Sequence, residues 1–162
     1  MLQKSFITYL SHEKRYSQHT ITSYQADLNQ FREYIQETFE LDLSAVKHNH
    51  LRSYMVDLME NNNSPQTVNR KISTLRSFYK FLLREGKIIS NPAALIKAPK
   101  VAKRLPVFVD SQKIDHLLDS EGYFGEDFPA VRDHLIIELL FGAGLRLAEL
   151  LQIKESDIDI YE

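Results

Sequence analysis

Apolar residues recur at the spacing of an amphipathic helix in four stretches that lie before residue 90. These stretches predict helices over about residues 2–13, 18–38, 50–60 and 65–84. Each predicted helix has one apolar face and one polar face, so the four can bury their apolar faces against one another. The pattern therefore predicts a compact helical bundle in the first half of the chain.

The fourth stretch carries the clearest signals for where a helix begins and ends. Ser64 is placed to cap the first turn, Pro65 stands at the first helical position, and Gly86 stands where a glycine often ends a helix. The side opposite its apolar face carries a basic and hydroxyl-bearing stripe of Asn69, Ser73, Arg76, Lys80 and Arg84, flanked by Arg70 and Lys71. This stripe would suit a DNA groove, whereas charge on the outer face of a helix more often serves only solvation.

The second and fourth stretches resemble each other at a fixed offset of 47 residues. The matching pairs are Ser17 and Ser64, Thr20 and Thr67, Ile21 and Val68, Leu28 and Leu75, Phe31 and Phe78, and Ile35 and Leu82. Two copies are too few for a solenoid, which needs about three repeats to bury its faces. The repeat instead favours a bundle built from two similar helix pairs.

The second half of the chain contains an apolar helix that stops at glycines and restarts on an arginine. Residues from about Ala130 to Phe141 predict a buried helix. Gly142 and Gly144 break it, and Arg146 begins a second helix. A guanidinium beside the free backbone N–H groups of a helix N-terminus suits a phosphate. The residues alone leave a plainer alternative open, which is a surface ion pair between Arg146 and Glu149.

A basic segment bracketed by prolines separates the two halves. Residues before proline avoid the α region, so this segment is expected to be an extended linker. A short helical piece through Leu95 and Ile96 is expected before it, and no convincing strand pattern occurs before Ile158. We expect three parts, which are a helical domain over residues 1–98, a linker over 99–106 and the start of a second domain over 107–162.

The two halves carry charge of opposite sign, although the whole chain has a net charge of −2. Residues 1–100 hold 14 Lys and Arg against 9 Asp and Glu, a net of +5, and residues 101–162 hold 6 against 13, a net of −7. The basic half is compatible with a polyanionic partner such as DNA. The absence of cysteine excludes disulfides and cysteine-bound metal. We expect a soluble cytoplasmic protein that is neither exported nor membrane-spanning.

Several motifs occur in a fixed order along the chain. The second predicted helix carries Ser17-x-x-Thr20-x-x-x-Tyr24-x-x-Asp27-Leu28-x-x-Phe31-x-x-Tyr34. The fourth carries Ser64-Pro65-x-Thr67-Val68-Asn69-Arg70-Lys71-x-x-x-Leu75-Arg76-x-Phe78-Tyr79-x-Phe81-Leu82. Later motifs are Asn91-Pro92-Ala93, Pro99-Lys100, Arg104-Leu105-Pro106 and Gly144-Leu145-Arg146-Leu147-Ala148-Glu149-Leu150. In this order and spacing the motifs resemble the tyrosine recombinases, the phage-integrase and Xer-type family, over essentially the whole chain.

The resemblance implies a mainly α protein, in which a four- to five-helix SAM-like core-binding bundle precedes the helical start of a mixed α/β catalytic domain. It implies that Arg146 is the first catalytic arginine, which holds the scissile phosphate through two hydrogen bonds, and that Glu149 keeps Arg146 in position. Because arginine can replace a metal in phosphoryl transfer, we expect no cofactor and no metal. The resemblance and the basic stripe together suggest DNA contacts from Thr20, Ser23, Tyr24, Asn69, Arg70, Lys71, Ser73, Arg76, Lys80, Lys103 and Arg104.

In the resembling family the other catalytic groups follow the first arginine, and the tyrosine nucleophile lies near the carboxyl end. None of these groups has a counterpart here, and Tyr161 falls where the catalytic sheet would only be beginning, so a strand residue is expected there. The intact protein is therefore expected to cut and rejoin DNA through a phosphotyrosine. The 162-residue fragment is expected to bind double-stranded DNA without cutting it, alongside other recombinase subunits on paired sites.

Two alternative functions stay open at this point. One is a DNA-binding relative of the same ancestry without catalysis, and the other is a helical protein-interaction module that shows no salt-sensitive DNA binding. His48 and His50 invite a metal site, but two histidines at this spacing do not share a helical face. Both are expected to be solvated.

Overall fold

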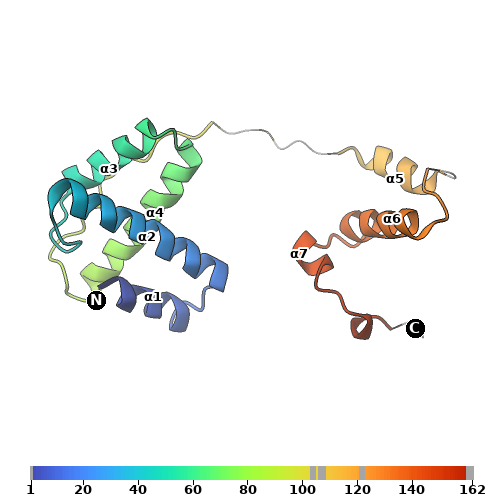
Figure 1. Cartoon of the computed structure of the whole chain (residues 1–162), viewed down its shortest axis with the longest axis horizontal. Helices are drawn as coiled ribbons and strands as arrows, with labels where there is room; N and C mark the ends of the chain where they lie inside the picture. The colour runs from blue at the N-terminus through green and yellow to red at the C-terminus, as the bar shows by residue number, and fades with distance from the viewer. Residues whose placement is uncertain (1, 103–104, 106–108, 121–122, 160–162) are drawn as a thin grey trace. The chain divides into compact units, whose positions relative to one another are not determined.

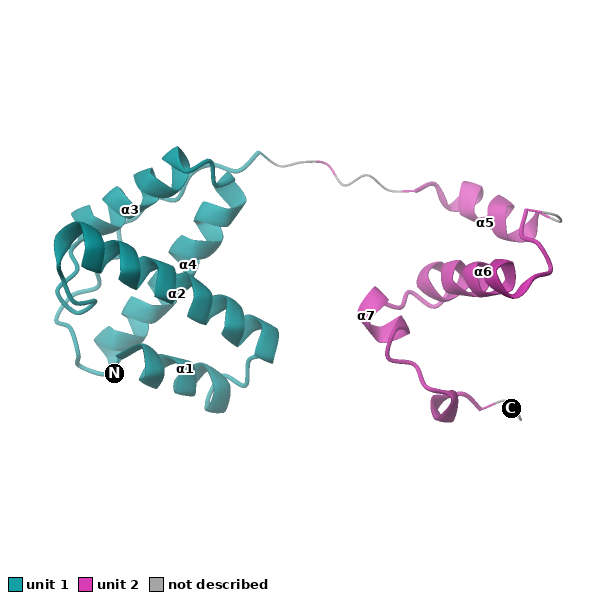
Figure 2. Cartoon of the chain, in the orientation of Figure 1, with its two compact units in different colours: residues 1–103 teal, residues 104–162 magenta. Residues whose placement is uncertain are grey.

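The computed structural model describes residues 2–102, 105, 109–120 and 123–159. The chain divides into two compact units, residues 1–103 and 104–162 (Figures 1 and 2). Every regular element among the described residues is a helix, and no strand occurs there. The helical bundle predicted from the apolar pattern and the mainly α fold implied by the resemblance are therefore confirmed for the described part of the chain. No helix of that part is long and apolar enough to cross a membrane.

The first unit contains four α-helices that pack against one another (Figure 1). Their bounds are α1 Leu2–His12, α2 Gln18–Phe39, α3 His48–Glu60 and α4 Pro65–Arg84. The predicted helix limits agree with these bounds within about two residues, and those of α4 match at both ends. The agreement follows from strong local signals, because Pro65 fits the first turn and Gly86, just beyond the helix, has a positive φ of 65°.

The core of the first unit is built from one apolar face of each helix. Its buried residues include Phe6, Leu10, Leu28, Phe31, Ile35, Leu51, Tyr54, Leu58, Ile72, Leu75, Phe78, Tyr79 and Leu82. Aromatic rings meet at its centre, where the Phe31 and Tyr54 centroids lie 4.9 Å apart. The Tyr79 hydroxyl donates to the Leu43 carbonyl at 3.0 Å. Burial raises the pKa of both the Tyr54 and the Tyr79 phenol, because a phenolate in this core would lack water.

The segment after α4 folds back on the bundle without forming the short helix expected through Leu95 and Ile96. Residues 92–95 form turns, and the Asn91 side chain accepts the Ala93 N–H at 2.9 Å. An asparagine that bonds the backbone two residues on favours a turn over a helix. Ala93 and Ile96 are nevertheless buried, whereas Leu95 is 81% exposed. The prediction of a short helix here was therefore wrong, although Ile96 does anchor the segment in the core.

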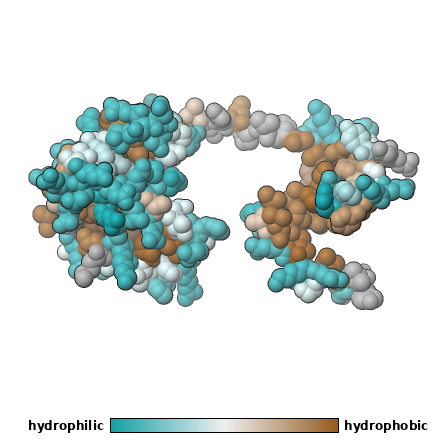
Figure 3. All heavy atoms as spheres, viewed as in Figure 1, coloured by the Kyte–Doolittle hydropathy of each residue, from teal (hydrophilic) through white to brown (hydrophobic). Residues whose placement is uncertain are grey.

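The second unit contains the α-helices α5 Ser111–Asp119, α6 Phe128–Phe141 and α7 Leu147–Leu150, followed by a 3-10 helix over Glu155–Asp157. No residue of α6 is buried, so the prediction that this helix is buried was wrong. The helix is apolar on several sides, and few described elements are available to cover it. Leu135 is 51% exposed, for example. Figure 3 shows hydrophobic residues gathered over α6 and α7.

Candidate functional site

The first candidate site is the corner between α6 and α7, and two glycines shape it. A Cβ at Gly142 would lie 2.8 Å from the Glu138 carbonyl oxygen, which is closer than real Cβ contacts come. Gly144 has a φ of +66°, a conformation that residues with side chains rarely adopt. Both positions therefore favour glycine, and the turn they make brings the chain to Arg146 at the N-cap of α7.

Arg146 and Glu149 hold each other in a reciprocal arrangement. The Arg146 guanidinium donates to Glu149 Oε1 at 2.8 Å, and the Arg146 backbone N–H donates to Oε2 at 2.8 Å. These two hydrogen bonds, the backbone one first, lower the pKa of the Glu149 carboxyl. The Arg146 side chain is 84% exposed. Because a guanidinium carries five N–H donors, an exposed one can bind a phosphate while it is fixed by a carboxylate.

The helix that follows Arg146 differs from the expected one in length. The element α7 spans only four residues, so its backbone can contribute little field to a bound anion. The phosphate site inferred from the sequence therefore depends on the guanidinium and not on a helix N-terminus.

The second candidate site is the basic stripe of α4, and the structure ties part of it to α2. Asp27 is only 2% exposed and accepts hydrogen bonds from the Arg70 guanidinium at 2.5 Å and from Lys71 Nζ at 3.1 Å. Thr74 Oγ1 also donates to Asp27, at 2.9 Å. The Arg70 side chain keeps 51% exposure, but that of Lys71 keeps only 11%. Lys71 is thus mainly a structural partner of a buried carboxylate.

Two further residues of the stripe bind the segment that follows α4. The Asn69 side chain donates to the Pro99 carbonyl at 3.0 Å, and the Arg76 guanidinium donates to the Ile96 carbonyl. Backbone carbonyls in this segment have no helix of their own to satisfy them, so these side chains fix its path. Asn69 and Arg76 therefore hold the start of the predicted linker against α4.

The remaining candidates divide between capping, exposed and undescribed positions. The Thr20 backbone N–H donates to Ser17, the N-cap of α2, and the Ser23 hydroxyl donates to the His19 carbonyl at 3.0 Å. Tyr24 is half-buried, whereas Ser73 and Lys80 are exposed. Lys103, Arg104 and Tyr161 lie outside the described residues, as does part of the predicted linker over 99–106. The structure thus leaves Arg70, Ser73, Lys80 and Arg84 as the exposed members of the stripe, and Arg84 is paired with Glu85 at 3.1 Å.

The two histidines singled out in the sequence are not simply solvated, and that prediction was wrong. His48 Nδ1 lies 3.3 Å from the Pro92 carbonyl, and His50 Nδ1 accepts the Lys47 N–H at 3.1 Å. The His50 ring also lies 4.6 Å from that of Phe39. Both fix the start of α3. Among the described residues no group of three or more His, Cys, Asp or Glu is placed to hold a metal ion.

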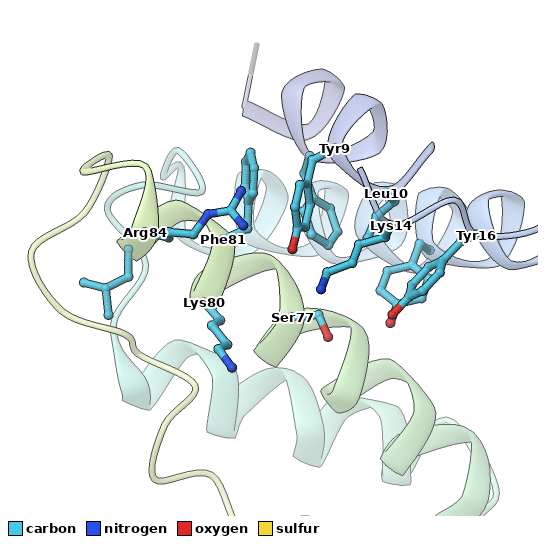
Figure 4. Close-up of a pocket in the computed structure, with 11 residues that line it drawn as sticks. Tyr9, Leu10, Lys14, Tyr16, Ser77, Lys80, Phe81 and Arg84 are labelled. Atoms are coloured by element: carbon cyan, nitrogen blue, oxygen red, sulfur yellow. The ribbon is translucent and has the colours of Figure 1, made fainter. Parts of the chain in front are cut away.

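Two features of the structure, the buried Asp27 and a cleft beside α1, were not predicted from the sequence. Asp27 appeared only as part of a motif, although a buried aspartate predicted on a helix needs a basic partner. Lys14 and Tyr16 lie in the turn between α1 and α2. They line a cleft together with residues of α1, α2 and α4 (Figure 4). The basic and aromatic composition of that turn was the available signal.

Comparisons with known proteins find a matching family model and relatives that cover most of this chain. The family model of the phage integrase N-terminal SAM-like domain matches residues 4–86. A tyrosine recombinase XerC of Halalkalibacterium halodurans is 36% identical over 156 residues, which cover 96% of this chain and 51% of the relative. One of Alcanivorax borkumensis is 40% identical over 158 residues, which cover 98% and 50%. The chain thus spans about half the length of these relatives.

Solved structures show a similar fold. The Tn1549 transposon integrase in complex with circular intermediate DNA has a TM-score of 0.70 at 15% identity, over 99% of this chain and 51% of that one. The integrase from mycobacterium phage Brujita has a TM-score of 0.59 at 20% identity, over 98% and 50%. At such identities the likeness concerns the fold alone.

Proposed function

The chain belongs to the phage-integrase family of tyrosine recombinases, and we propose that it is the DNA-binding half of a site-specific recombinase. The observation that carries this proposal is the match of the family's SAM-like domain model to residues 4–86. We assign residues 1–98 to the core-binding domain, 99–106 to the linker and 107–162 to the first part of the catalytic domain. The circular intermediate DNA bound in the Tn1549 integrase structure supports DNA as the partner, and we propose that this DNA is double-stranded.

The DNA-contacting face is proposed to lie on α4, around its exposed polar residues. Ser73 and Lys80 are exposed, and Arg70 is half-exposed while Asp27 holds it in place. A fixed guanidinium loses less side-chain entropy when it binds a phosphate or a base edge. Asn69, Lys71 and Arg76 would act indirectly, by keeping the helix and the following segment in place.

In the intact protein Arg146 would stabilise the scissile phosphate as a tyrosine nucleophile attacks it. The phosphorus gains a bond to the tyrosine oxygen and loses its bond to the 5′ or 3′ sugar oxygen, so negative charge rises on the non-bridging oxygens. A guanidinium answers that charge with two parallel hydrogen bonds and does not titrate. Glu149, which holds both the backbone and the side chain of Arg146, would keep the donors aimed. The activity also requires other subunits on paired sites.

This 162-residue chain is proposed to bind DNA without cleaving it. Covalent strand cleavage needs a nucleophile beside the phosphate that Arg146 would hold. No tyrosine in the chain stands in the sequence context that the family uses for that nucleophile. Arg146 alone would therefore stabilise a charge that does not develop.

The proposal is tested by the salt dependence of DNA binding. The chain is titrated against a duplex at several salt concentrations, and the logarithm of the binding constant should fall linearly with the logarithm of salt. Replacing Lys80 with alanine should flatten the slope by about 0.9 if its ammonium neutralises one phosphate. Lys113→Ala, which changes an exposed lysine of the second unit, is the matched control and should leave the slope unchanged. Binding that does not respond to salt would instead favour a protein-interaction module.

A further inference from the structure

A cleft with a volume of about 570 Å³ opens between α1, the turn after it, α2 and α4. The volume lies within the range of about 300–1,000 Å³ that is usual for small-molecule sites. Figure 4 shows its labelled side chains, which come from α1, the turn after it and α4. Its lining includes Tyr9, Lys14, Tyr16, Tyr24, Lys80 and Arg84. Apolar, phenolic and cationic groups are thus combined in one concave surface.

The aromatic rings of the cleft differ in how far they are already engaged. Tyr9 stacks on Phe81 with centroids 5.0 Å apart, and the Arg84 guanidinium lies 4.3 Å from the Tyr9 centroid. Tyr16 is 41% exposed, and its ring centroid lies 6.1 Å from that of Tyr24 in a tilted arrangement. Tyr16 is therefore the ring with an accessible face, because a tilted neighbour at this distance does not cover it.

Cations surround these rings, and every ionisable group in the cleft's lining other than tyrosine is a lysine or an arginine. The Lys14 ammonium points into the cleft between Tyr9 and Tyr16, with Nζ 5.9 Å from the Tyr9 centroid (Figure 4). Lys80 lines the cleft from α4, with its ammonium directed away from Tyr9 and Tyr16 (Figure 4). The charge of Arg84 is partly met by Glu85 at 3.1 Å and Glu13 at 3.8 Å. Lys14 therefore supplies most of the charge offered to a ligand.

We propose that this cleft binds an unpaired nucleotide, with its base on the face of Tyr16 and its phosphate at Lys14. A flat ring beside an ammonium group matches a nucleotide, which carries a π-face and an anion a short distance apart. Bases inside a duplex stack on their neighbours, so only an extruded or unpaired base can present its face to a tyrosine. The ligand is therefore a nucleotide that has left the duplex.

The position of the cleft favours DNA over other anionic ligands. Lys80 belongs both to the cleft and to the proposed DNA-contacting face of α4, so a strand bound along that face lies next to the cleft. The choice of DNA as the ligand therefore rests on the proposed function. Strand exchange also requires unpaired nucleotides, because a cut strand must leave its old partner before it joins a new one. The cleft would hold such a nucleotide while the remaining duplex stays bound.

The test compares a perfect duplex with the same duplex carrying one bulged nucleotide, each labelled and titrated with the full chain. The chain should bind the bulged duplex more tightly. Tyr16→Ala should weaken that binding by about 5- to 150-fold, the effect of losing one base–aromatic stack, and leave the perfect duplex unchanged. Tyr16→Phe keeps the ring and should retain the preference. Tyr123→Ala, which removes another exposed tyrosine far along the sequence in the second unit, should change neither affinity.

A second variant and two competitors complete the experiment. Lys14→Gln should reduce the bulge preference and its salt dependence, which keeps the test valid should Tyr16→Ala not fold. If free dAMP displaces the bulged duplex but not the perfect duplex, the cleft also accepts free nucleotides. If free dAMP displaces neither duplex while the preference for the bulge remains, the cleft binds a nucleotide only within a strand.

The outcomes separate this inference from the proposed function. Equal affinity for the two duplexes, or equal loss on both in Tyr16→Ala, would overturn the cleft assignment while duplex binding stands. Tyr16-dependent binding of a labelled acidic peptide, without any bulge preference, would overturn it in favour of a protein partner. Binding of the bulged nucleotide by a chain that does not bind a perfect duplex would overturn the proposed function and leave the cleft in place.

Discussion

At the scale of single residues, Asp27 decides what the basic stripe of α4 can do. Its buried carboxylate binds Arg70, Lys71 and Thr74, all from the opposing helix. Thr74 is also the residue that matches Asp27 at the 47-residue offset of the internal repeat. The charges of Arg70 and Lys71, which the sequence pattern places on an outer surface, are therefore partly neutralised by a carboxylate inside the bundle. The charge of α4 that is available to an external anion is correspondingly smaller than the sequence suggests.

Replacing Asp27 with asparagine should destabilise the first unit by about 3 kcal/mol. The change leaves Lys71, only 11% exposed, without a carboxylate, and breaking a buried pair from one side typically costs about 3–5 kcal/mol. The lower end applies because Arg70 is half-exposed and can turn to water. Urea unfolding followed by far-ultraviolet circular dichroism measures the loss. Glu33→Gln, an exposed carboxylate on the same helix, is the control, and a loss for Asp27→Asn as small as for this control would contradict the structural role.

The carboxyl of Glu149 should titrate below its ordinary range, and Arg146→Ala should raise its pKa only part of the way back. The backbone N–H of Arg146 is the larger cause of the depression and survives the substitution, whereas the guanidinium bond does not. The bonds to the ionised Glu149 carboxyl stabilise α7 fully at pH values above the unfolded-state pKa of about 4.3. This stabilisation is lost as the pH falls through the lower pKa of the folded state. A carbon-detected NMR titration measures the pKa of the Glu149 carboxyl in the original chain and in the Arg146→Ala variant. A pKa of Glu149 that is unchanged by Arg146→Ala would show that the side-chain bond is absent in solution.

At the scale of elements, the internal repeat accounts for the two longest helices of the bundle. Ser17 and Ser64 cap α2 and α4 with nearly the same backbone angles, and each hydroxyl accepts an N–H three residues on, at 3.3 and 3.2 Å. The paired apolar residues of the repeat are buried in both helices. The two helices thus begin alike and bury the same side, which lets them pack across one core.

Ser17→Ala and Ser64→Ala should each reduce the stability of the first unit by about 1 kcal/mol, the usual effect of losing an N-cap side chain. Because the two caps have nearly the same geometry, the two losses should agree within about 0.5 kcal/mol, and the double variant should lose their sum. Thermal or urea unfolding measures all three. Ser73→Ala, at an exposed position within α4, serves as the control and should change stability little. Clearly unequal losses would show that one cap is not formed in solution.

Local signals account for the elements that the sequence predicted well, and tertiary contacts account for the rest. Ser64, Pro65 and Gly86 determine α4 without reference to any other helix, so its limits could be predicted from sequence. The roles of Arg76 and Asn69 could not, because the carbonyls they bind belong to a segment 20 and 30 residues away. The exposure of Leu135 on α6 could not be predicted either, since an apolar pattern shows which residues favour burial but not which neighbours are present to bury them.

At the scale of the whole molecule, charge and proposed function divide between the two units. The basic part of the chain holds the proposed DNA contacts, and the acidic part, with a net of −7 over residues 101–162, holds the residue proposed to act on a phosphate. An acidic unit repels DNA at long range, so affinity has to come from the basic unit. Binding and catalysis should therefore be separable by mutation.

In the intact protein, Arg146→Ala should leave the affinity for site DNA within a few-fold of the original and slow strand cleavage by about 10²–10³-fold or more. The substitution removes a donor that acts on charge formed only in the transition state, and losing one such donor typically has an effect of that size. A gel shift measures affinity, and covalent attachment of protein to a nicked substrate measures cleavage.

Arg132→Ala is the matched control for that experiment. Arg132 is likewise exposed and paired with a neighbouring carboxylate, Asp133, at 2.7 Å, so its loss removes the same surface charge without the proposed role. It should leave both measurements unchanged. Phosphotyrosine formation at the normal rate by Arg146→Ala would contradict the catalytic assignment of Arg146. Covalent attachment of the 162-residue chain to DNA would contradict the proposal that its nucleophile lies elsewhere, because the phosphate would then have been attacked by a tyrosine that these residues already contain.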